Sequence, residues 1–197
     1  MFLKHAWIAG EVTRRFAVAV VDVDAAGGLI DGVLGMDLLG ERAIDVDLRV
    51  NRLVLHRKGD AGFRSSGLAW TDYTPLDGGQ IALRVTLDGH PATAILDLGA
   101  NHTFANAHVG LASDGAGASV SAAIGADRHD LMFRPVKDVV IGLGELALRA
   151  PSVWIGDLPI FQTFGIADRS AVLLGVDALA GRRIVIDPFS QRIYVSR

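Results

Sequence analysis

The sequence predicts a mainly β fold, and three observations carry that expectation. Apolar residues come in short runs or alternate with polar residues, which is typical of strands rather than helices. Gly is abundant, at 23 residues, and Pro is modest, at 6, so many short strands joined by tight turns are expected. Helical periodicity is scarce along the chain, so helices are expected to be few and short.

The expected strands follow the apolar runs in chain order, and Val and Ile, which favour strands, are frequent in them. These runs cover residues 16–23, 52–55, 81–87, 93–96, 136–141, 152–155 and 184–186. Short helices are expected at residues 36–40, 106–111 and 176–180. The sequence therefore predicts strands along the whole chain, interrupted by short helices of a single turn.

Composition excludes several classes of function. The net charge of -3 offers no basic surface for nucleic acid. Cysteine is absent, which removes disulfides, thiol catalysis and cysteine metal sites. The 6 His residues show no metal-binding spacing, so neither a metal nor another cofactor is expected.

The chain carries no recognisable targeting or membrane segment. No apolar run approaches the roughly 18 residues of a membrane span, so no membrane span is expected. Residues 1–10 are too short and too mixed for a signal peptide. A cytoplasmic location is the default expectation, or export if a leader precedes Met1. Richness in Ala, Gly and Arg favours a bacterial source.

An internal repeat organises the chain. Residues 33–39, Val-Leu-Gly-Met-Asp-Leu-Leu, recur as residues 173–179, Leu-Leu-Gly-Val-Asp-Ala-Leu. The same offset of 140 positions continues downstream, where Arg42, Ile44, Asp47 and Arg52 match Arg182, Ile184, Asp187 and Arg192. The sequence therefore predicts the later half of one lobe at residues 1–57, a linker at 58–78 and a complete lobe at 79–197.

A half lobe leaves strand edges unpaired and one face of its core uncovered. We therefore expect the natural protein to be longer at its N-terminus, by roughly 60–100 residues. That segment is expected to contain a second copy of the Asp-x-Gly motif that is described next for the complete lobe.

One loop of the complete lobe carries the motif of most interest. An apolar strand, residues 92–96, leads into Asp97-Leu98-Gly99-Ala100-Asn101. Further on, Leu174-Gly175 ends a hydrophobic-hydrophobic-Gly element. In these features residues 79–197 resemble the retropepsin-like and pepsin-type aspartic proteases, with the loop in the place of the family's Asp-Thr/Ser-Gly-Ala. The resemblance implies a closed β-barrel lobe, with a partial second lobe of the same type in front.

The resemblance also implies a chemistry. Asp97 is the expected catalytic residue of a peptidase, sharing a water with a second Asp. Leu98, Gly99, Ala100 and Asn101 shape the active-site loop, while Leu174 and Gly175 support it. The substrate is a peptide or protein, over which residues 115–133 close as a flap. The second Asp comes from a homodimer partner or from the missing N-terminal segment.

Leu98 is the departure from the family pattern, because the family has a Thr or Ser hydroxyl there and Leu has no donor or acceptor. An active peptidase and a catalytically inactive peptide-binding or scaffolding domain are both open. A third alternative is an unrelated β-sandwich binding protein in which Asp97 only makes a turn. Asp37 and Asp177, which occupy matched positions in the repeat, are expected to cap the short helices that follow them.

Overall fold

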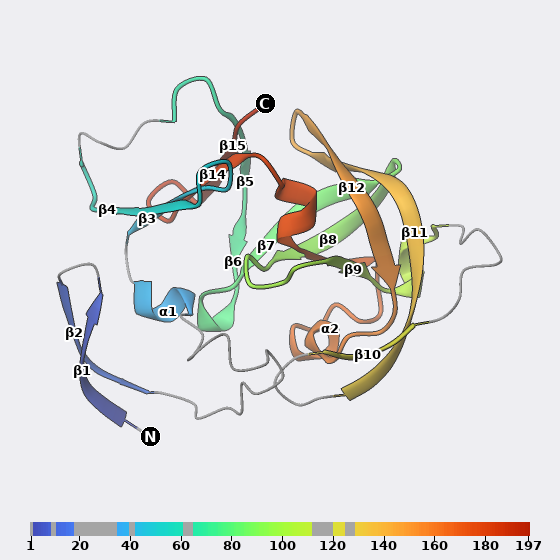
Figure 1. Ribbon diagram of the computed structural model, residues 1–197, viewed down its shortest axis with the longest axis horizontal. Helices are drawn as coiled ribbons and strands as arrows, with labels where there is room; N and C mark the ends of the chain where they lie inside the picture. Colours follow the sequence, from blue (N-terminus) through green and yellow to red (C-terminus); the bar gives the residue numbers. More distant parts are fainter. Residues whose placement is uncertain are drawn as a thin grey trace.

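A computed structural model describes residues 2–8, 11–17, 35–39, 42–60, 65–111, 120–124 and 129–197. The protein is mainly β, as predicted, with a closed barrel, a second sheet beside it and a separate two-stranded hairpin (Figure 1). That hairpin pairs β1 (Phe2–Ile8) with β2 (Glu11–Ala17). No described helix is long and apolar enough to cross a membrane.

Six strands close the barrel, in the order β11-β12-β9-β13-β8-β7, and β11 then pairs with β7. At this closure Gly142 of β11 lies close to β7, where a Cβ would meet the Oγ1 of Thr86. Two short strands, β10 and β6, extend the sheet at its ends. The strands are β6 (Thr74–Pro75), β7 (Ile81–Leu87), β8 (His90–Leu96), β9 (Thr103–Ala105), β10 (Val120–Ile124), β11 (His129–Leu143), β12 (Leu146–Ile155) and β13 (Ala171–Leu174).

Strand β13 lies between β8 and β9, although both precede it by many residues. It pairs in parallel with β8, where Leu174 is opposite Leu96, and antiparallel with β9. All four of its residues are buried, as expected for a strand covered on both faces. This arrangement brings the end of β13 against the loop that joins β8 to β9.

The second sheet has five strands in the order β4-β3-β14-β15-β5. Strands β3 and β14 pair antiparallel at its centre. Its members are β3 (Ala43–Asp47), β4 (Arg52–His56), β5 (Ala69–Asp72), β14 (Arg183–Asp187) and β15 (Arg192–Val195). The helices are single turns: α1 (Met36–Leu39), η2 (Asp77–Gly79), η3 (Ala107–Val109), α2 (Pro159–Thr163) and η4 (Val176–Leu179).

One hydrophobic core joins the barrel to the second sheet. Leu83, Ile141 and Leu148 enter it from the barrel, and Ile184 and Ile186 enter it from the sheet. A smaller cluster lies under α2 on the other face of β8 and β13, formed by Ile95, Phe104, Phe133, Leu158, Phe161, Ala171 and Leu173. Because β8 and β13 are buried on both faces, the loop at their ends has a rigid base.

The expected elements compare with the structure as follows. Strand β7 has the expected bounds, and β11 and β12 extend the expected runs toward a long hairpin. The expected helices at 106–111 and 176–180 are the 3₁₀ helices η3 and η4. Of the expected strand 16–23, residues beyond 17 lie outside the described part of the chain. Helix α2 was not expected from the sequence; it begins at Pro159, whose missing N–H costs nothing in a first helical turn.

Within 58–78, expected to be a linker, the structure has strands β5 and β6 and helix η2. Strand β5 pairs with β15 and thereby completes one edge of the second sheet. The Trp70 ring of β5 is 48% exposed and stacks on Arg192, whose guanidinium carbon is 3.8 Å from the ring centroid. The lobe boundaries themselves stay a prediction.

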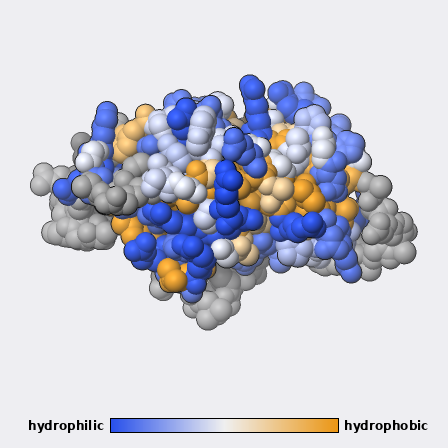
Figure 2. Space-filling model, turned by 90° about the horizontal axis from the view of Figure 1, so that it is seen from above, coloured by the Kyte–Doolittle hydropathy of each residue, from blue (hydrophilic) through white to orange (hydrophobic). Residues whose placement is uncertain are grey.

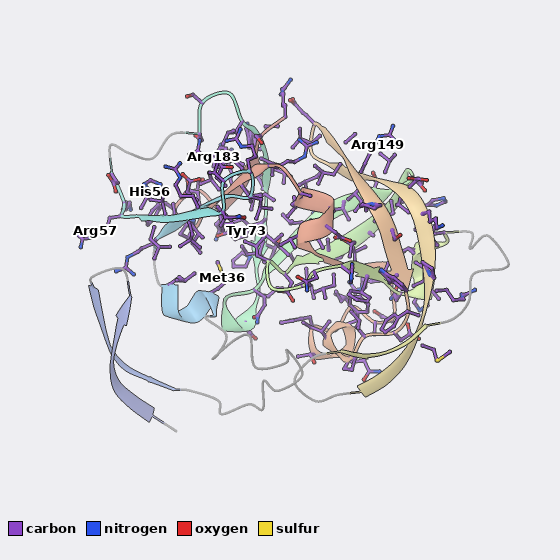
Figure 3. The ribbon with its side chains drawn as sticks, in the orientation of Figure 1. Met36, His56, Arg57, Tyr73, Arg149 and Arg183 are labelled. Carbon is purple, nitrogen blue, oxygen red and sulfur yellow. The ribbon has the colours of Figure 1, made fainter. Side chains whose placement is uncertain are left out.

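A buried ionic network lies on the face of the second sheet that points away from the core. Arg183 donates from its Nε and NH2 groups to the two oxygens of Asp45, at 2.8 and 2.7 Å. His56 Nε2 is 3.3 Å from Oδ2 of the same carboxylate. Figure 3 shows His56 and Arg183 on neighbouring parts of this sheet. Asp45 is only 3% exposed, so its charge depends on these partners.

We expect the second sheet to lose stability in acid. Burial opposes ionisation of Asp45, yet hydrogen bonds from Arg183 and His56 outweigh it and hold the pKa below its ordinary 3.8. The Arg49 hydrogen bond lowers the pKa of Asp47 to about 2. Because both folded-state pKa values are depressed, the stabilisation is complete above pH 3.8 and is lost as the pH falls toward 2.

Urea unfolding at a series of pH values between 6 and 2 measures this loss. The variant Asp47→Asn should show a flatter decline in the free energy of unfolding below pH 4, because one of the depressed carboxyls is gone. An equal slope for the variant and the wild type would contradict the assignment.

Candidate active site

Backbone hydrogen bonds tie the Asp97 loop to the end of β13. The Asp97 N–H donates to the Leu174 carbonyl at 3.0 Å, which continues the parallel pairing one step past β8. The Ala100 N–H donates to the Asp97 carbonyl at 3.2 Å and closes a tight turn. The Val176 N–H then donates to the Ala100 carbonyl at 2.9 Å. The loop is therefore fixed at its start and at its far side.

The carboxylate of Asp97 is part-exposed at the tip of this turn. The Gly99 N–H donates to its Oδ1 at 2.8 Å. A Cβ on residue 99 would lie 3.2 Å from the same oxygen, so Gly lets the backbone approach the carboxylate closely. In the described part of the chain, Gly99 is the residue whose N–H donates to this carboxylate, through Oδ1.

Gly175 allows the close packing of β13 against the loop. A Cβ at this position would lie 2.4 Å from the His102 carbonyl oxygen and 2.9 Å from the Ala100 carbonyl oxygen. Both obstacles are backbone atoms, so neither moves aside by a rotamer change. The hydrophobic-hydrophobic-Gly element ends in Gly because the loop occupies the space of a side chain.

The variant Gly175→Ala should therefore destabilise the fold by about 3 kcal/mol, the upper part of the range for overpacking. The free energy of urea unfolding measures the effect. Gly165→Ala is the matched control, since a Cβ there meets nothing within 4 Å and only its φ of +62° is unfavourable. That control should cost about 1 kcal/mol. Equal losses in the two variants would contradict the packing argument.

Thr103 and Asp177 form a clamp across the loop. The Thr103 hydroxyl and N–H donate to the two carboxylate oxygens of Asp177, at 2.6 and 3.0 Å. The same hydroxyl accepts the Gly175 N–H at 3.2 Å. Thr103 is fully buried. The clamp thus joins the first residue of β9 to the turn after β13, directly beside the Asp97 loop.

Asp177 was expected to cap the following helix. It lies in the first turn of η4, while Gly175 occupies the N-cap position. Its Oδ1 does accept the Ala178 N–H at 2.8 Å. The larger role, the clamp on Thr103, was not predicted, because the two residues are 74 positions apart. The sequence signal that was available is the recurrence of Asp two positions after Gly in both halves of the repeat.

We expect Thr103→Val to destabilise the loop by about 1–3 kcal/mol, because it leaves the Gly175 N–H without its acceptor and removes one of the two donors to Asp177 Oδ1. Valine keeps the shape of threonine, so cavity formation does not contribute. Hydrogen exchange of the Gly175 amide, compared with that of the Leu83 amide in the barrel core, measures the local loss. An unchanged exchange rate at the Gly175 amide would mean that the clamp does not contribute to the stability of the loop.

The remaining predicted loop residues fall into two groups. Leu98 packs partly buried against the main core, and Ala100 packs against the smaller cluster under α2. Asn101 is exposed. His102 is exposed as well, with its ring 6.0 Å from that of Trp154 and its Nδ1 3.9 Å from Asp177 Oδ2. Leu98 therefore anchors the loop by apolar contact.

Part of the predicted site lies outside the described residues. Within the predicted flap 115–133, β10 and the start of β11 form an antiparallel hairpin with Ile124 opposite His129, and residues 115–119 and 125–128 are not described. Residues 33 and 34 of the earlier hydrophobic-hydrophobic-Gly element are likewise not described, nor is the Asp37 side chain. Over the described ranges, no group of three or more His, Asp or Glu residues is placed to hold a metal ion.

Comparison with family models and with curated proteins finds no match for this chain. Among solved structures, a retropepsin-like aspartic protease from Rickettsia conorii is similar, at 15% identity and a TM-score of 0.44, over 66% of this chain and 92% of that chain. Basic 7S globulin from soybean is similar at 15% identity and a TM-score of 0.44, over 78% of this chain and 50% of that chain. The present chain thus spans about half the length of the globulin. The roles of its individual residues rest on its own geometry.

Proposed function

We propose that this protein is an aspartic-type peptidase in which Asp97 supplies one of two catalytic carboxylates. The observation that supports this most is the fixed position and the partial solvent exposure of Asp97. It lies part-exposed on a turn that β13 and η4 hold by backbone hydrogen bonds, and Gly99 engages only its Oδ1. A carboxylate that is fixed in position and still open to water is what a water-activating base requires.

The chemistry needs a second carboxylate close to the first. One ionised carboxylate takes a proton from water, whose oxygen attacks the peptide carbonyl carbon, while the protonated partner donates to the carbonyl oxygen. The C–N bond then breaks as the nitrogen takes up a proton. Two carboxyls at such close range share one proton and titrate as a pair.

The second carboxylate comes from beyond the described residues of this chain. A homodimer would bring Asp97 to Asp97 across a twofold axis. The N-terminal segment that the repeat leads us to expect ahead of Met1 is the other source. A depression of about 580 Å³ lies between η2 and the end of α2, and Asp97 is not among the residues that line it. In this proposal, the element that brings the second carboxylate also lines the substrate cleft over Asp97.

Leu98 favours a second candidate function, a peptide-binding domain without catalysis, because it lacks the hydroxyl of the related loops. The argument for activity is that the loop is held by other means. Leu98 packs on the main core, and the Thr103–Asp177 clamp holds the far side of the turn. Positioning of Asp97 thus does not depend on a hydroxyl at residue 98.

A peptide-library cleavage assay between pH 3 and pH 7 tests the proposal. We expect cleavage with a bell-shaped dependence on pH, as a shared proton requires, and its loss in Asp97→Asn. Sedimentation velocity in parallel gives the oligomeric state, and a specific activity that rises with protein concentration identifies the homodimer as the source of the second Asp. Cleavage that Asp97→Asn leaves unchanged would remove Asp97 from the mechanism. Specific peptide binding without cleavage at any pH would favour the binding domain.

A further inference from the structure

The surface is hollowed at the end of the barrel that carries the Asp97 loop. Strands β7 and β8 are antiparallel, and Ile81 at the start of β7 pairs with Leu96 at the end of β8. Gln80 comes directly before Ile81 and has an extended backbone. Because neighbouring strands lie about 5 Å apart, Gln80 is a neighbour of Asp97. Gln80 also lines the depression of about 580 Å³ between η2 and the end of α2, which therefore begins beside the candidate active site.

One side of the depression is apolar. Leu76 and Phe164 line it, and both are half-buried against the smaller cluster under α2. Ala100 of the Asp97 loop packs against the same cluster, so the depression and the loop share one base. Apolar surface alone selects no particular ligand on this protein, because hydrophobic residues reach the surface among hydrophilic ones on the face that Figure 2 shows. Selection at the depression must come from its polar groups.

The polar side chains that line the depression offer acceptors. When the Gln80 amide is oriented by its hydrogen bonds, its nitrogen donates to the main-chain oxygens of Asp77 and Gly78, at 2.6 and 3.2 Å. Its Oε1 then remains as an acceptor. The Thr163 hydroxyl donates to the Pro159 carbonyl at 3.2 Å, so its lone pairs remain as acceptors too. Side-chain donors here are therefore already used, and a ligand with donors of its own fits better than one with acceptors.

Asp77 adds a negative charge to these acceptors. It is the one ionisable residue among those that line the depression, and it is exposed. Among the described residues, no side chain forms an ion pair with its carboxylate. Lys and Arg side chains carry donors and no acceptor, and their apolar stems pack along apolar surface while the charged head stays near water. A cation can also lie over an aromatic ring, which Phe164 supplies.

We propose that the depression binds the side chain of an arginine or a lysine in the peptide that the Asp97 site cleaves, and that Asp77 is the residue that selects it. Asp97 does not line the depression, so the basic residue is removed from the bond that is cut. This inference rests on the peptidase function proposed above and names its substrate class, which is peptides with a basic residue at a fixed distance from the cleaved bond.

Cleavage of matched peptide pools at pH 6 tests the inference. Each pool has arginine fixed at one position of an octapeptide and uncharged residues elsewhere, and its partner pools carry norleucine or glutamate at the fixed position. Norleucine keeps an unbranched apolar side chain without the charge. We expect kcat/KM for the arginine pool to exceed that for the norleucine pool about tenfold at one position, and the glutamate pool to be slowest there. Sequencing of the products gives the distance from the basic residue to the cut bond.

Substitutions of Asp77 assign the preference to the depression. Asp77→Asn should bring the arginine and norleucine pools within about twofold of each other, and Asp77→Lys should prefer the glutamate pool to the arginine pool. Asp157→Asn is the matched control, because Asp157 is exposed and lies two residues before α2 but does not line the depression. It should keep the tenfold preference for arginine.

A binding measurement distinguishes failure of this inference from failure of the peptidase function. The same pools are labelled with fluorescein, and their anisotropy is titrated with Asp97→Asn, with and without Asp77→Asn. Tighter binding of an arginine pool that Asp77→Asn abolishes would support the depression as a site for a basic side chain, even if the wild type cleaves no pool and the peptidase proposal fails. Binding and cleavage that never distinguish arginine from norleucine would overturn the inference, and so would equal loss of the preference in Asp77→Asn and Asp157→Asn.

Discussion

Replacing Asp97 with asparagine is expected to lower kcat for peptide cleavage by about 10²–10⁴-fold, the usual contribution of a general base, with little change in KM. Asparagine has the size of aspartate, and its side-chain oxygen can still accept the Gly99 N–H that now bonds Oδ1 at 2.8 Å. The loop should therefore keep its shape while losing the proton acceptor. Steady-state kinetics at the pH of maximal cleavage measure the effect.

Asp157→Asn is the matched control for this substitution. Asp157 is exposed and lies two residues beyond the end of β12, outside the Asp97 loop. It should retain wild-type kcat and the wild-type free energy of unfolding. If Asp97→Asn also kept wild-type kcat, the cleavage would belong to another site. If it lost stability by several kcal/mol, its loss of activity would reflect unfolding, and a test with Asp97→Glu would then separate chemistry from folding.

The sequence predicted the parts of the fold that local pattern determines. Strand β7 alternates buried and less buried residues, and its bounds were predicted correctly because Gly79 and the Asp88-Gly89 turn limit it on both sides. The mainly β class followed from the same kind of signal. The Asp97 loop could be singled out because each of its parts has a local sequence pattern. These parts are an apolar strand, a Gly and a second apolar strand that ends in Gly.

Contacts between distant segments were not predictable in this way. The Thr103–Asp177 clamp joins residues that are far apart in the chain. The sequence around either residue does not indicate which residue it contacts. Strand β5 is only four residues long and follows a Gly- and Ser-containing stretch, so local pattern favoured a linker. It becomes a strand because β15 offers an edge and Arg192 holds both Trp70 and Asp72. Tertiary pairing decided its structure.

Arg183→Met should destabilise the protein by about 3–5 kcal/mol. Methionine keeps much of the apolar stem of arginine but removes both hydrogen bonds to Asp45. The carboxylate of Asp45 is 4% exposed, so it would remain buried with His56 Nε2 as its remaining side-chain partner, 3.3 Å from Oδ2. Because His56 remains as a partner, the lower end of that range is the expected value. Urea unfolding at pH 7 measures it.

An exposed ion pair of the same type supplies the control. Arg169 pairs with Asp168 at 3.2 Å, and the two side chains are 60% and 78% exposed. Arg169→Met should change the free energy of unfolding by less than about 1 kcal/mol, because water already solvates both charges. The contrast between Arg183 and Arg169 therefore isolates burial as the cause. Equal losses in the two variants would contradict it.

The pH dependence of the Arg183→Met loss gives an independent check of its cause. Without Arg183, burial raises the pKa of Asp45, since the hydrogen bonds that now lower it are mostly gone. The variant should then take up a proton at Asp45 at higher pH than the wild type does. Its deficit in unfolding free energy should shrink as the pH falls below 4, because the buried carboxyl is neutral there. A deficit that is constant from pH 7 to pH 3 would mean that lost packing, and not an unpaired charge, destabilises the variant.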